Sequence, residues 1–394
     1  MENKKQVIYL DNNATTQIDK RVLDAMMPFL TNEFANANST HQFGVNAYQA
    51  VKIARSQVSE LIGAEAHEIV FTSGSTEAIN LAIKGVAENY QTKGKHIVTV
   101  STEHTAVLDT CKYLKNKGFD VTFLSVNYDG LIDLKELKTA LRDDTILVCV
   151  MLANNETGVI QPIKEIAELS HKVGAFFFSD VTQAVGKLPL NVDDLGIDLL
   201  CISGHKLYAP KGVGALYVRQ RINPVKIPAL FHGGGHERGQ RSGTLNVTGI
   251  VGLGAACSIA QKEMFKNAEK IVDLRNYLES ELLKTEGTSI NGNIEKRLYN
   301  TSNILFRGVD SDAIIMNLSN LDNDLPLIAV SNGSACTSHS IEPSHVLIAI
   351  GLNENEAFNS IRFSLGKDNN KGEIETTIEA VKKGVINLRS MTNY

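Results

Sequence analysis

The segment AFFFSDVTQAVGKLPLNVDDLGIDLLCISGHK, residues 175–206, contains two short apolar runs that each end in polar residues. The first run, AFFF, leads into Asp180, and the second, DLLCIS, leads into His205 and Lys206. Continuous apolar runs of this length are typical of strands that are buried on both faces of a parallel sheet. The segment therefore predicts two successive strands with an acid and a lysine at their carboxyl ends.

The same pattern extends to both sides of this segment, from about residue 69 to residue 218. Seven β-rich runs, EIVFT, KHIVTV, VTFLSV, TILVCVM, AFFFSD, DLLCIS and GALYV, alternate with helical patterns such as residues 76–90 and 163–173. Such alternation is typical of a mainly parallel sheet with helices on both faces. We therefore predict an α/β protein whose large domain, residues 16–260, contains a mainly parallel seven-stranded sheet.

The last hundred residues have a different pattern. After the glycine-rich stretch FHGGGHERGQRSGT (231–244), a long helical pattern follows, and the runs NTSNILFRG and SIRFSL are typical of strands. The apolar residues of the final helical pattern share one face. These features predict a small α+β domain formed by residues 1–15 and 261–394.

Composition argues against several classes of protein. The chain has 394 residues, of which 43% are hydrophobic and 21% charged, and its net charge is −5. These values are ordinary for a globular protein and do not indicate binding to nucleic acid, which favours a basic surface. The N-terminus has no leader-like apolar segment and no run is long enough to span a membrane, so we expect a cytoplasmic protein without a membrane partner.

The five cysteines are far apart and include no CxxC pair, so disulfides and a structural metal site are not expected. Cys336 lies among small polar residues in SNGSACTSHS (331–340) and is either an incidental surface thiol or a mobile nucleophile. The other four lie in apolar or helical segments and are predicted to be structural: Cys111, Cys149, Cys201 and Cys257.

The segment FTSGSTEAINLAI (71–83) predicts a strand, a glycine-containing turn and a helix that begins near Thr76. The free N–H groups at the start of such a helix suit a phosphate, and the hydroxyl groups of Ser75 and Thr76 add further donors. The alternative is an ordinary helix cap made by a serine or threonine. The chain has no Walker A motif and no strand-following GxGxxG, so nucleotide binding of those kinds is not supported.

Further polar residues follow other predicted strands. His104 follows HIVTV, Asn155 follows TILVCVM, Asp180 closes AFFFSD and Lys206 follows DLLCIS. Each has an ordinary alternative explanation as a helix cap, a turn residue or a surface charge. Because the carboxyl ends of parallel strands gather at one edge of a sheet, we expect these residues to lie together. A phosphate turn, an acid and a lysine are the groups that pyridoxal phosphate (PLP) requires, so the sequence favours a PLP site.

The chain resembles the cysteine desulfurases of the NifS/IscS type, which have the PLP-transferase fold of type I. The resemblance covers nearly the whole sequence and consists of motifs in matching order: YLDNNATT, SGSTE, TEH, NNETG, SDVTQAVGK, SGHK, APKG, GGGHERGQRSGTLN, GSACTS and SIRFSLG. It implies a homodimer that uses PLP to convert L-cysteine to alanine. It also implies that the sulfur passes to an acceptor protein, such as an iron–sulfur scaffold.

The resemblance further implies a role for each matching residue. Lys206 would bind PLP covalently, Asp180 would pair with the pyridinium nitrogen, and His104 would stack on the ring and assist proton transfer. Gln183 would bind the phenolic oxygen of the cofactor, and Asn155 and Arg362 would bind the substrate carboxylate. The phosphate would be bound by five residues, the last of them from a second subunit: Ser75, Thr76, Ser203, His205 and Thr244.

Cys336 would then be the nucleophile that takes sulfur from cysteine and carries it as a persulfide. Two other interpretations remain open. A selenocysteine lyase or another class-V PLP aminotransferase would retain Lys206 and Asp180 without depending on Cys336. A non-catalytic interaction protein on the same fold would need none of the three residues.

Overall fold

A computed structural model describes residues 7–319, 326–333 and 342–392 of the chain. Its largest sheet has seven strands in the order β2-β8-β7-β6-β5-β3-β4, and only β8 runs antiparallel to its neighbours. The strands are β2 Ile69–Thr72, β3 His96–Val100, β4 Asp120–Leu124, β5 Thr145–Cys149, β6 Phe176–Asp180, β7 Leu199–Ser203 and β8 Gly214–Val218. The predicted mainly parallel, seven-stranded sheet is confirmed.

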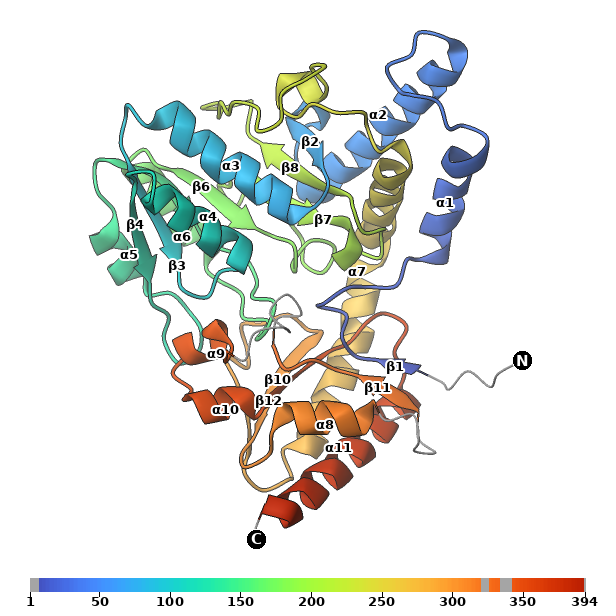
Figure 1. The fold of residues 1–394 in the computed structure, drawn as a ribbon, viewed down its shortest axis with the longest axis vertical. Helices are drawn as coiled ribbons and strands as arrows, with labels where there is room; N and C mark the ends of the chain where they lie inside the picture. The colour runs from blue at the N-terminus through green and yellow to red at the C-terminus, as the bar shows by residue number, and fades with distance from the viewer. Residues whose placement is uncertain (1–6, 320–325, 334–341, 393–394) are drawn as a thin grey trace.

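Helices cover both faces of this sheet (Figure 1). One face packs against α3 Ser75–Tyr90 and α4 Thr105–Lys115. The other face is covered by five helices: α1 Lys20–Thr31, α2 Gln42–Ile62, α5 Leu134–Ala140, α6 Ile163–Lys172 and α7 Val247–Leu282. Because both faces are covered, the central strands are buried along nearly their whole length, which is why they appear in the sequence as continuous apolar runs.

The C-terminal part forms a second core beside the large sheet. Its three-stranded antiparallel sheet has the order β12-β10-β9, and β1 pairs in parallel with β11. The elements are β1 Val7–Tyr9, β9 Thr288–Ile290, β10 Thr301–Phe306, α8 Ser311–Leu318, β11 Leu327–Ala329, α9 His345–Ala349, α10 Glu354–Phe358, β12 Ser360–Ser364 and α11 Lys371–Thr392. The N-terminal strand therefore pairs with a strand of the C-terminal part, and Ile8 packs into the same core.

Helix α7 is 36 residues long and joins the two cores. Cys257 and Met264 pack into the core of the large sheet, whereas Ile271 and Leu278 pack into the core of the small lobe. The predicted domain boundary at residue 260 thus falls inside one continuous helix. At 1.5 Å per residue, this helix is about 54 Å long.

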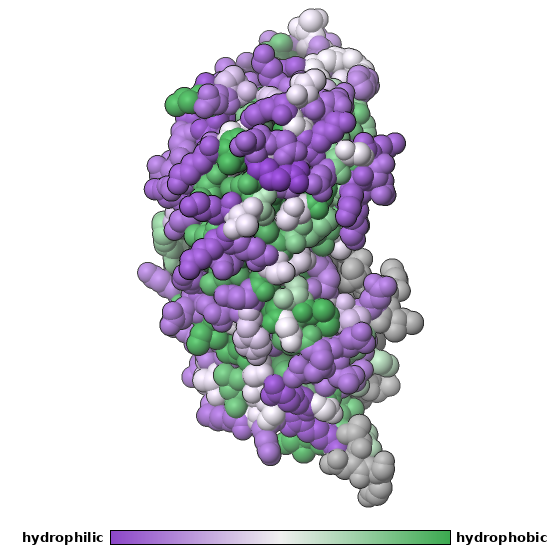
Figure 2. Space-filling model, turned by 90° about the vertical axis from the view of Figure 1, so that its left-hand side faces the viewer, coloured by the Kyte–Doolittle hydropathy of each residue, from purple (hydrophilic) through white to green (hydrophobic). Residues whose placement is uncertain are grey.

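The described residues also show the nature of the helices, of the surface and of the cysteines. Within residues 7–319, 326–333 and 342–392, no helix is long and apolar enough to cross a membrane, and no three potential metal ligands cluster together. The face shown in Figure 2 is mostly hydrophilic, with apolar groups scattered between the polar ones. The four cysteines predicted to be structural are buried free thiols: Cys111, Cys149, Cys201 and Cys257.

Candidate active site

The polar residues that follow successive strands gather at the carboxyl edge of the large sheet. Thr76 follows β2, His104 follows β3, Asn155 follows β5, Asp180 ends β6 and Lys206 follows β7. These five strands all run in the same direction, so their ends meet on one side of the sheet. The predicted gathering of the candidate residues at one edge is therefore what the topology produces.

The first N–H groups of α3 are not capped by a side chain, a geometry that suits an anion. Its N-cap is Gly74, which has no side chain to occupy the first N–H groups of the helix. The backbone of Gly74 has φ 157° and ψ −178°, a region that is essentially restricted to glycine. A Cβ atom added there would lie 3.6 Å from Ser203 Oγ, so the ends of β2 and β7 approach each other at this turn. The alternative in which Ser75 or Thr76 simply caps the helix is thus wrong.

His205 lies beside this turn as a neutral side chain. Burial, together with the charges of Lys206 and Lys211, lowers the pKa of His205 to about 4. Its Nδ1 atom is 3.1 Å from Thr15 Oγ1. A phosphate group suits this arrangement of groups. They are the neutral imidazole of His205, the hydroxyl groups at the ends of β2 and β7, and the uncapped N–H groups at the start of α3.

Lys206 is held by the N-terminal segment of the chain. Its Nζ atom donates to the backbone oxygens of Asn13 at 2.6 Å and Ala14 at 2.5 Å. Gln183 Nε2 donates to the same Asn13 oxygen at 3.0 Å, so Lys206 and Gln183 share an acceptor. Asn13 belongs to the motif YLDNNATT, and no role for it was predicted from the sequence. The signal available was the two consecutive asparagines ahead of two threonines, a polar run directly after an apolar strand.

Asp180 and Gln183 supply buried polar groups at the same edge. Asp180 is 6% exposed, and one of its carboxylate oxygens accepts a hydrogen bond from Thr182 N at 2.9 Å. Gln183 Oε1 is buried without a hydrogen-bond partner among the described residues. A carboxylate, an amide with unused capacity, a lysine and a phosphate turn match the ring nitrogen, phenolic oxygen, aldehyde and phosphate of PLP. The residues present therefore fit this cofactor.

His104 is the N-cap of α4. Its Nδ1 atom accepts a hydrogen bond from Ala106 N at 3.1 Å, so the capping alternative raised from the sequence does occur. Because Nδ1 is an acceptor, the neutral ring carries its proton on Nε2. The cap fixes the ring at the sheet edge and does not conflict with a second role there.

Arg362 is the largest fully buried side chain at the boundary between the two cores. It donates from Nη2 to Asp11 Oδ1 at 2.7 Å and from Nη1 to Asn155 O at 3.0 Å, while its Nε atom is buried without a hydrogen-bond partner in the described part of the chain. Asn13 Nδ2 donates to the same Asn155 oxygen at 3.2 Å. Asn13 therefore connects the lysine end of the site to the arginine end. Asp11 belongs to the same motif as Asn13, and its role was likewise not predicted from the sequence.

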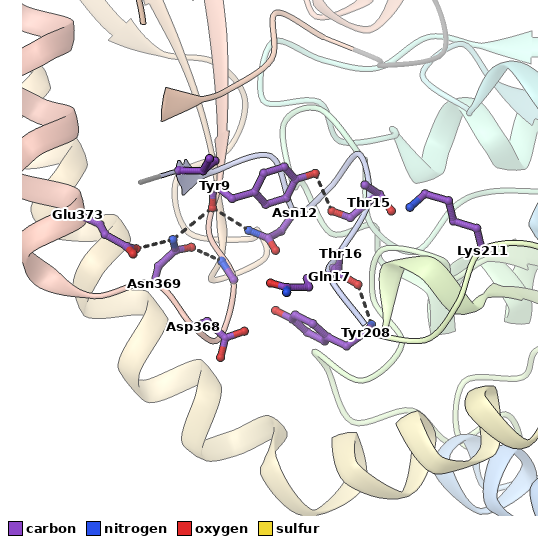
Figure 3. A pocket seen from close by; sticks show the side chains of 12 residues that line it. Tyr9, Asn12, Thr15, Thr16, Gln17, Tyr208, Lys211, Asp368, Asn369 and Glu373 are labelled. Atoms are coloured by element: carbon purple, nitrogen blue, oxygen red, sulfur yellow. Dashed lines mark hydrogen bonds between the residues drawn. The ribbon is translucent and has the colours of Figure 1, made fainter. Parts of the chain in front are cut away.

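The segment that holds Lys206 is fixed from both sides. A cavity of about 480 Å³ adjoins it, lined by residues of the N-terminal segment, the turn after η2 (Gly204–Lys206) and the small lobe (Figure 3). Tyr9 OH donates to Thr15 O at 3.0 Å, and Tyr208 N donates to Thr16 Oγ1 at 2.8 Å. These bonds keep the carbonyl groups of Asn13 and Ala14 directed at the lysine.

Two of the predicted residues lie away from this cluster or outside the described residues. Thr244 is exposed in the segment between η3 (Glu237–Gly239) and α7. Cys336 lies outside the described residues. The described residues on each side of its segment both approach Glu156, since Ser344 Oγ donates to Glu156 Oε2 at 2.5 Å and a Cβ added at Gly333 would lie 3.5 Å from the same oxygen.

The chain matches a known protein family, curated relatives and solved structures along nearly its whole length. The aminotransferase class-V family model matches residues 8–376. The cysteine desulfurase IscS of Escherichia coli is 51% identical over 391 residues, which cover 98% of this chain and 95% of that protein. A solved NifS-like protein is 37% identical, with a TM-score of 0.90 over 97% of this chain and all of the other. SspA, solved in complex with cysteine, is 38% identical, with a TM-score of 0.79 over 91% of this chain and 98% of the other.

The resemblance inferred from the sequence motifs is confirmed by these matches, which extend over almost the whole length of both partners. The type I PLP-transferase fold is likewise confirmed. The chain therefore belongs to the class-V aminotransferase family and, within it, to the PLP-dependent cysteine desulfurases.

Proposed function

We propose that this protein removes the sulfur of L-cysteine with the help of PLP, releases alanine, and passes the sulfur from Cys336 to an acceptor protein. One observation carries the proposal: Asn13 connects Lys206 to Arg362. The Asn13 carbonyl accepts from Lys206, and its side chain donates to the Asn155 carbonyl that Arg362 also contacts. The amine that would hold PLP and the guanidinium that would hold a carboxylate are therefore connected through two residues, Asn13 and Asn155, which places both groups in one site.

The cofactor residues would act by position and charge. PLP supplies the electron sink that weakens bonds at the carbon atoms of a bound amino acid. Asp180 would keep the ring nitrogen protonated, and Gln183 would hydrogen-bond the phenolic oxygen. His104 would face the ring, and Lys206 would hold the aldehyde carbon and move protons at the substrate. The phosphate would be bound at the start of α3 by the hydroxyl and imidazole groups gathered there: Ser75, Thr76, Ser203 and His205.

The substrate carboxylate would be bound by Arg362 together with Asn155. A guanidinium presents its N–H groups in a planar fork that matches a carboxylate, and Arg362 has a buried Nε without a partner among the described residues. The related SspA was solved with cysteine bound, which supports the same substrate for this chain.

Sulfur transfer would use the thiolate of Cys336. The Cys336 sulfur forms an S–S bond with the substrate sulfur, the C–S bond of the substrate breaks, and the carbon takes up a proton to give alanine. Atoms and electrons balance, because L-cysteine plus the enzyme thiol become alanine plus the enzyme persulfide. The outer sulfur then passes to an acceptor protein, for which an iron–sulfur scaffold is the candidate that the resemblance implies.

A homodimer would complete the site. Helices α1 and α2 and the segment between them expose large apolar side chains: Leu23, Met27, Leu30, Phe34, Phe43, Tyr48 and Ile53. An exposed apolar surface of this extent is typical of a protein–protein interface. Thr244 is exposed, as a residue that reaches the phosphate of a second subunit would have to be in a single chain.

A single turnover of the purified protein with L-cysteine, without reductant, tests the function. We expect one alanine per site and one additional sulfur on Cys336, located by mass spectrometry of peptides. Cys336→Ser should retain PLP and accumulate no persulfide. Alanine formation that persists in this variant with a reductant, or a strong preference for selenocysteine, would instead identify a selenocysteine lyase. Absence of both products in the parent protein would contradict the proposal.

A further inference from the structure

A small cavity adjoins Lys206, and a second lysine lies in it. The cavity has a volume of about 40 Å³, which is room for one or two water molecules. It is lined by Lys187 and Lys206, by Ala256 and Ala260 of α7, and by Tyr299 and Leu365 of the small lobe. Lys187 belongs to the motif SDVTQAVGK, but none of the roles described above uses it.

The ammonium end of Lys187 is enclosed by protein, although the residue as a whole is only partly buried. Its Nζ atom donates to the backbone oxygen of Gln183 at 2.9 Å. Within the described part of the chain, no carboxylate lies within 4.0 Å of it. A buried ammonium group without a counter-ion is energetically unfavourable, so burial favours the neutral form of the Lys187 amine.

Hydrogen bonds connect Lys187 to Lys206 through two residues. Lys187 donates to the backbone of Gln183, the side chain of Gln183 donates to Asn13 O, and Lys206 donates to that same oxygen. The two lysines are therefore connected through Gln183 and the backbone oxygen of Asn13. Protonation of one amine therefore makes protonation of the other less favourable, because both amines face the same enclosed space and like charges repel.

None of the other titratable groups in the described lining of the cavity forms an ion pair with Lys187. The described lining includes five: Asp19, Tyr208, Glu263, Tyr299 and Lys367. Asp19 accepts from Arg21 and Lys367, and Glu263 accepts from Arg21, so both acids are already paired.

The two tyrosines and the neighbouring histidine are uncharged near neutral pH. Burial raises the pKa of Tyr208 to about 12 and raises that of Tyr299 further. His205, next to Lys206 in the chain, has its lowered pKa of about 4. Burial and the charge of Lys206 lower the pKa of Lys187 to about 7. Because electrostatic coupling is reciprocal, a charge on Lys187 equally disfavours a proton on Lys206.

We propose that Lys187 is a positioning residue for Lys206: from the shared cavity, its amine disfavours protonation of the Lys206 nitrogen and keeps that nitrogen reactive toward PLP. A lysine beside a second cationic group is an established way to obtain a nucleophilic amine. This inference rests on the proposed role of Lys206 in holding PLP. In this role Lys187 acts only through Lys206 and does not contact the substrate.

The test is a pH titration of the visible absorbance of bound PLP in the purified holoenzyme. Lys187→Met and Lys187→Gln remove the charge with two different side chains. We expect the midpoint to rise by up to about one pH unit in both, because the Lys206 nitrogen then holds its proton more tightly at pH values below about 7, where Lys187 is charged. Lys211→Met is the matched control. It removes an exposed lysine five residues after Lys206, and solvent should reduce its effect to a small fraction of that shift.

Borohydride reduction followed by peptide mapping gives an independent readout of where PLP is attached. PLP on Lys206 with an unchanged or lowered midpoint in either neutral variant would overturn the inference and leave Lys187 with a structural role. Attachment of PLP to a different residue in the parent protein would instead contradict the proposed function. The two failures are therefore distinguishable.

Discussion

Asp11 and Arg362 form an ion pair across the boundary between the two cores, with Asp11 Oδ1 2.7 Å from Arg362 Nη2. The guanidinium is 1% exposed, so Asp11 balances a buried positive charge when no substrate is present. A substrate carboxylate would add a second anion to the same arginine. Asp11 therefore holds the guanidinium in place while limiting how tightly it can bind a carboxylate.

Replacement of Arg362 by lysine should weaken substrate binding. A lysine keeps the charge but loses the planar fork and at least one charge-assisted hydrogen bond, a loss of about 1.5–3 kcal/mol. We expect KM for L-cysteine to rise by about tenfold or more while PLP absorbance is retained. Steady-state kinetics measure the change, with Arg142→Lys at an exposed ion pair as the control. An unchanged KM would remove Arg362 from the substrate site.

Replacement of Lys206 by alanine should abolish the visible absorbance that PLP has when it is bound to a lysine. The hydrogen bonds to the backbone oxygens of Asn13 and Ala14 hold this amine at the carboxyl edge of the sheet. An absorption spectrum of the purified variant, with PLP content determined after acid release, measures the effect. A spectrum identical to that of the parent protein would show that another lysine holds the cofactor.

Glu237 should contribute strongly to stability. Both of its carboxylate oxygens accept from Arg55, at 2.6 and 2.7 Å, and one also accepts from Phe71 N at 2.8 Å. This fastens the glycine-rich loop that leads to Thr244 onto strand β2. Glu237→Gln leaves a partly buried guanidinium without its anion and should lower the free energy of unfolding by about 3 kcal/mol.

Urea unfolding gives this difference directly. Asp144→Asn, at an exposed ion pair with Arg142, is the control and should cost less than about 1 kcal/mol. A similarly small change for Glu237→Gln would mean that the loop is held by other contacts.

The cofactor-free protein should lose stability as the pH falls through the range in which His205 titrates. The folded-state pKa of His205 is about 4, below the ordinary value of 6.5, so the unfolded chain takes up the proton first. The contribution of neutral His205 to the free energy of unfolding is fully present above about pH 6.5 and is lost as the pH falls from about 6.5 to about 4. It amounts to about 2 kcal/mol after allowance for partial exposure.

Urea unfolding at a series of pH values isolates this contribution when the parent protein is compared with His205→Gln. The variant should have a shallower loss of stability with acid. His67→Gln, which changes an exposed histidine, should follow the parent. Identical pH dependence in parent and His205→Gln would contradict the assignment.

A charge placed on the apolar surface of α1 and α2 should disrupt the proposed dimer. Phe34 is 72% exposed, and Phe34→Glu would bury an unpaired carboxylate if two chains met there. We expect a monomer in size-exclusion chromatography with light scattering, together with weaker retention of PLP. Met316→Glu, at a methionine of α8 that is 73% exposed, should leave the oligomeric state unchanged. A dimeric Phe34→Glu would move the interface elsewhere.

Much of the fold could be predicted because buried parallel strands leave an unmistakable pattern. All seven runs proposed as strands belong to the large sheet, and the helices near 76–90 and 163–173 lie within one residue of the expected limits. The order of the strands could not be predicted in the same way. It depends on which strands pair, and apolar runs such as those of β5 and β7 are chemically alike.

The site was predictable to the extent that its residues follow strands. Asp180, Lys206 and Asn155 could be proposed because each comes directly after an apolar run. Asn13 and Asp11 were not, since their role depends on contacts with residues more than 140 positions away. Lys187 shows a third case, because a buried lysine and an exposed one look the same in a sequence.

The N-terminal segment that contacts Lys206 is held by the opposite end of the chain. Strand β1 pairs with Leu327–Ala329, and Asn12 and Asn13 bond to Ser364, about 350 residues later. While the protein is being made on a ribosome, residues 7–15 thus emerge long before their partners exist. Contacts of such long sequence separation form late. The lysine can be enclosed only after the final strand β12 has left the ribosome, so an incomplete chain would present an open site and capture of PLP would follow synthesis.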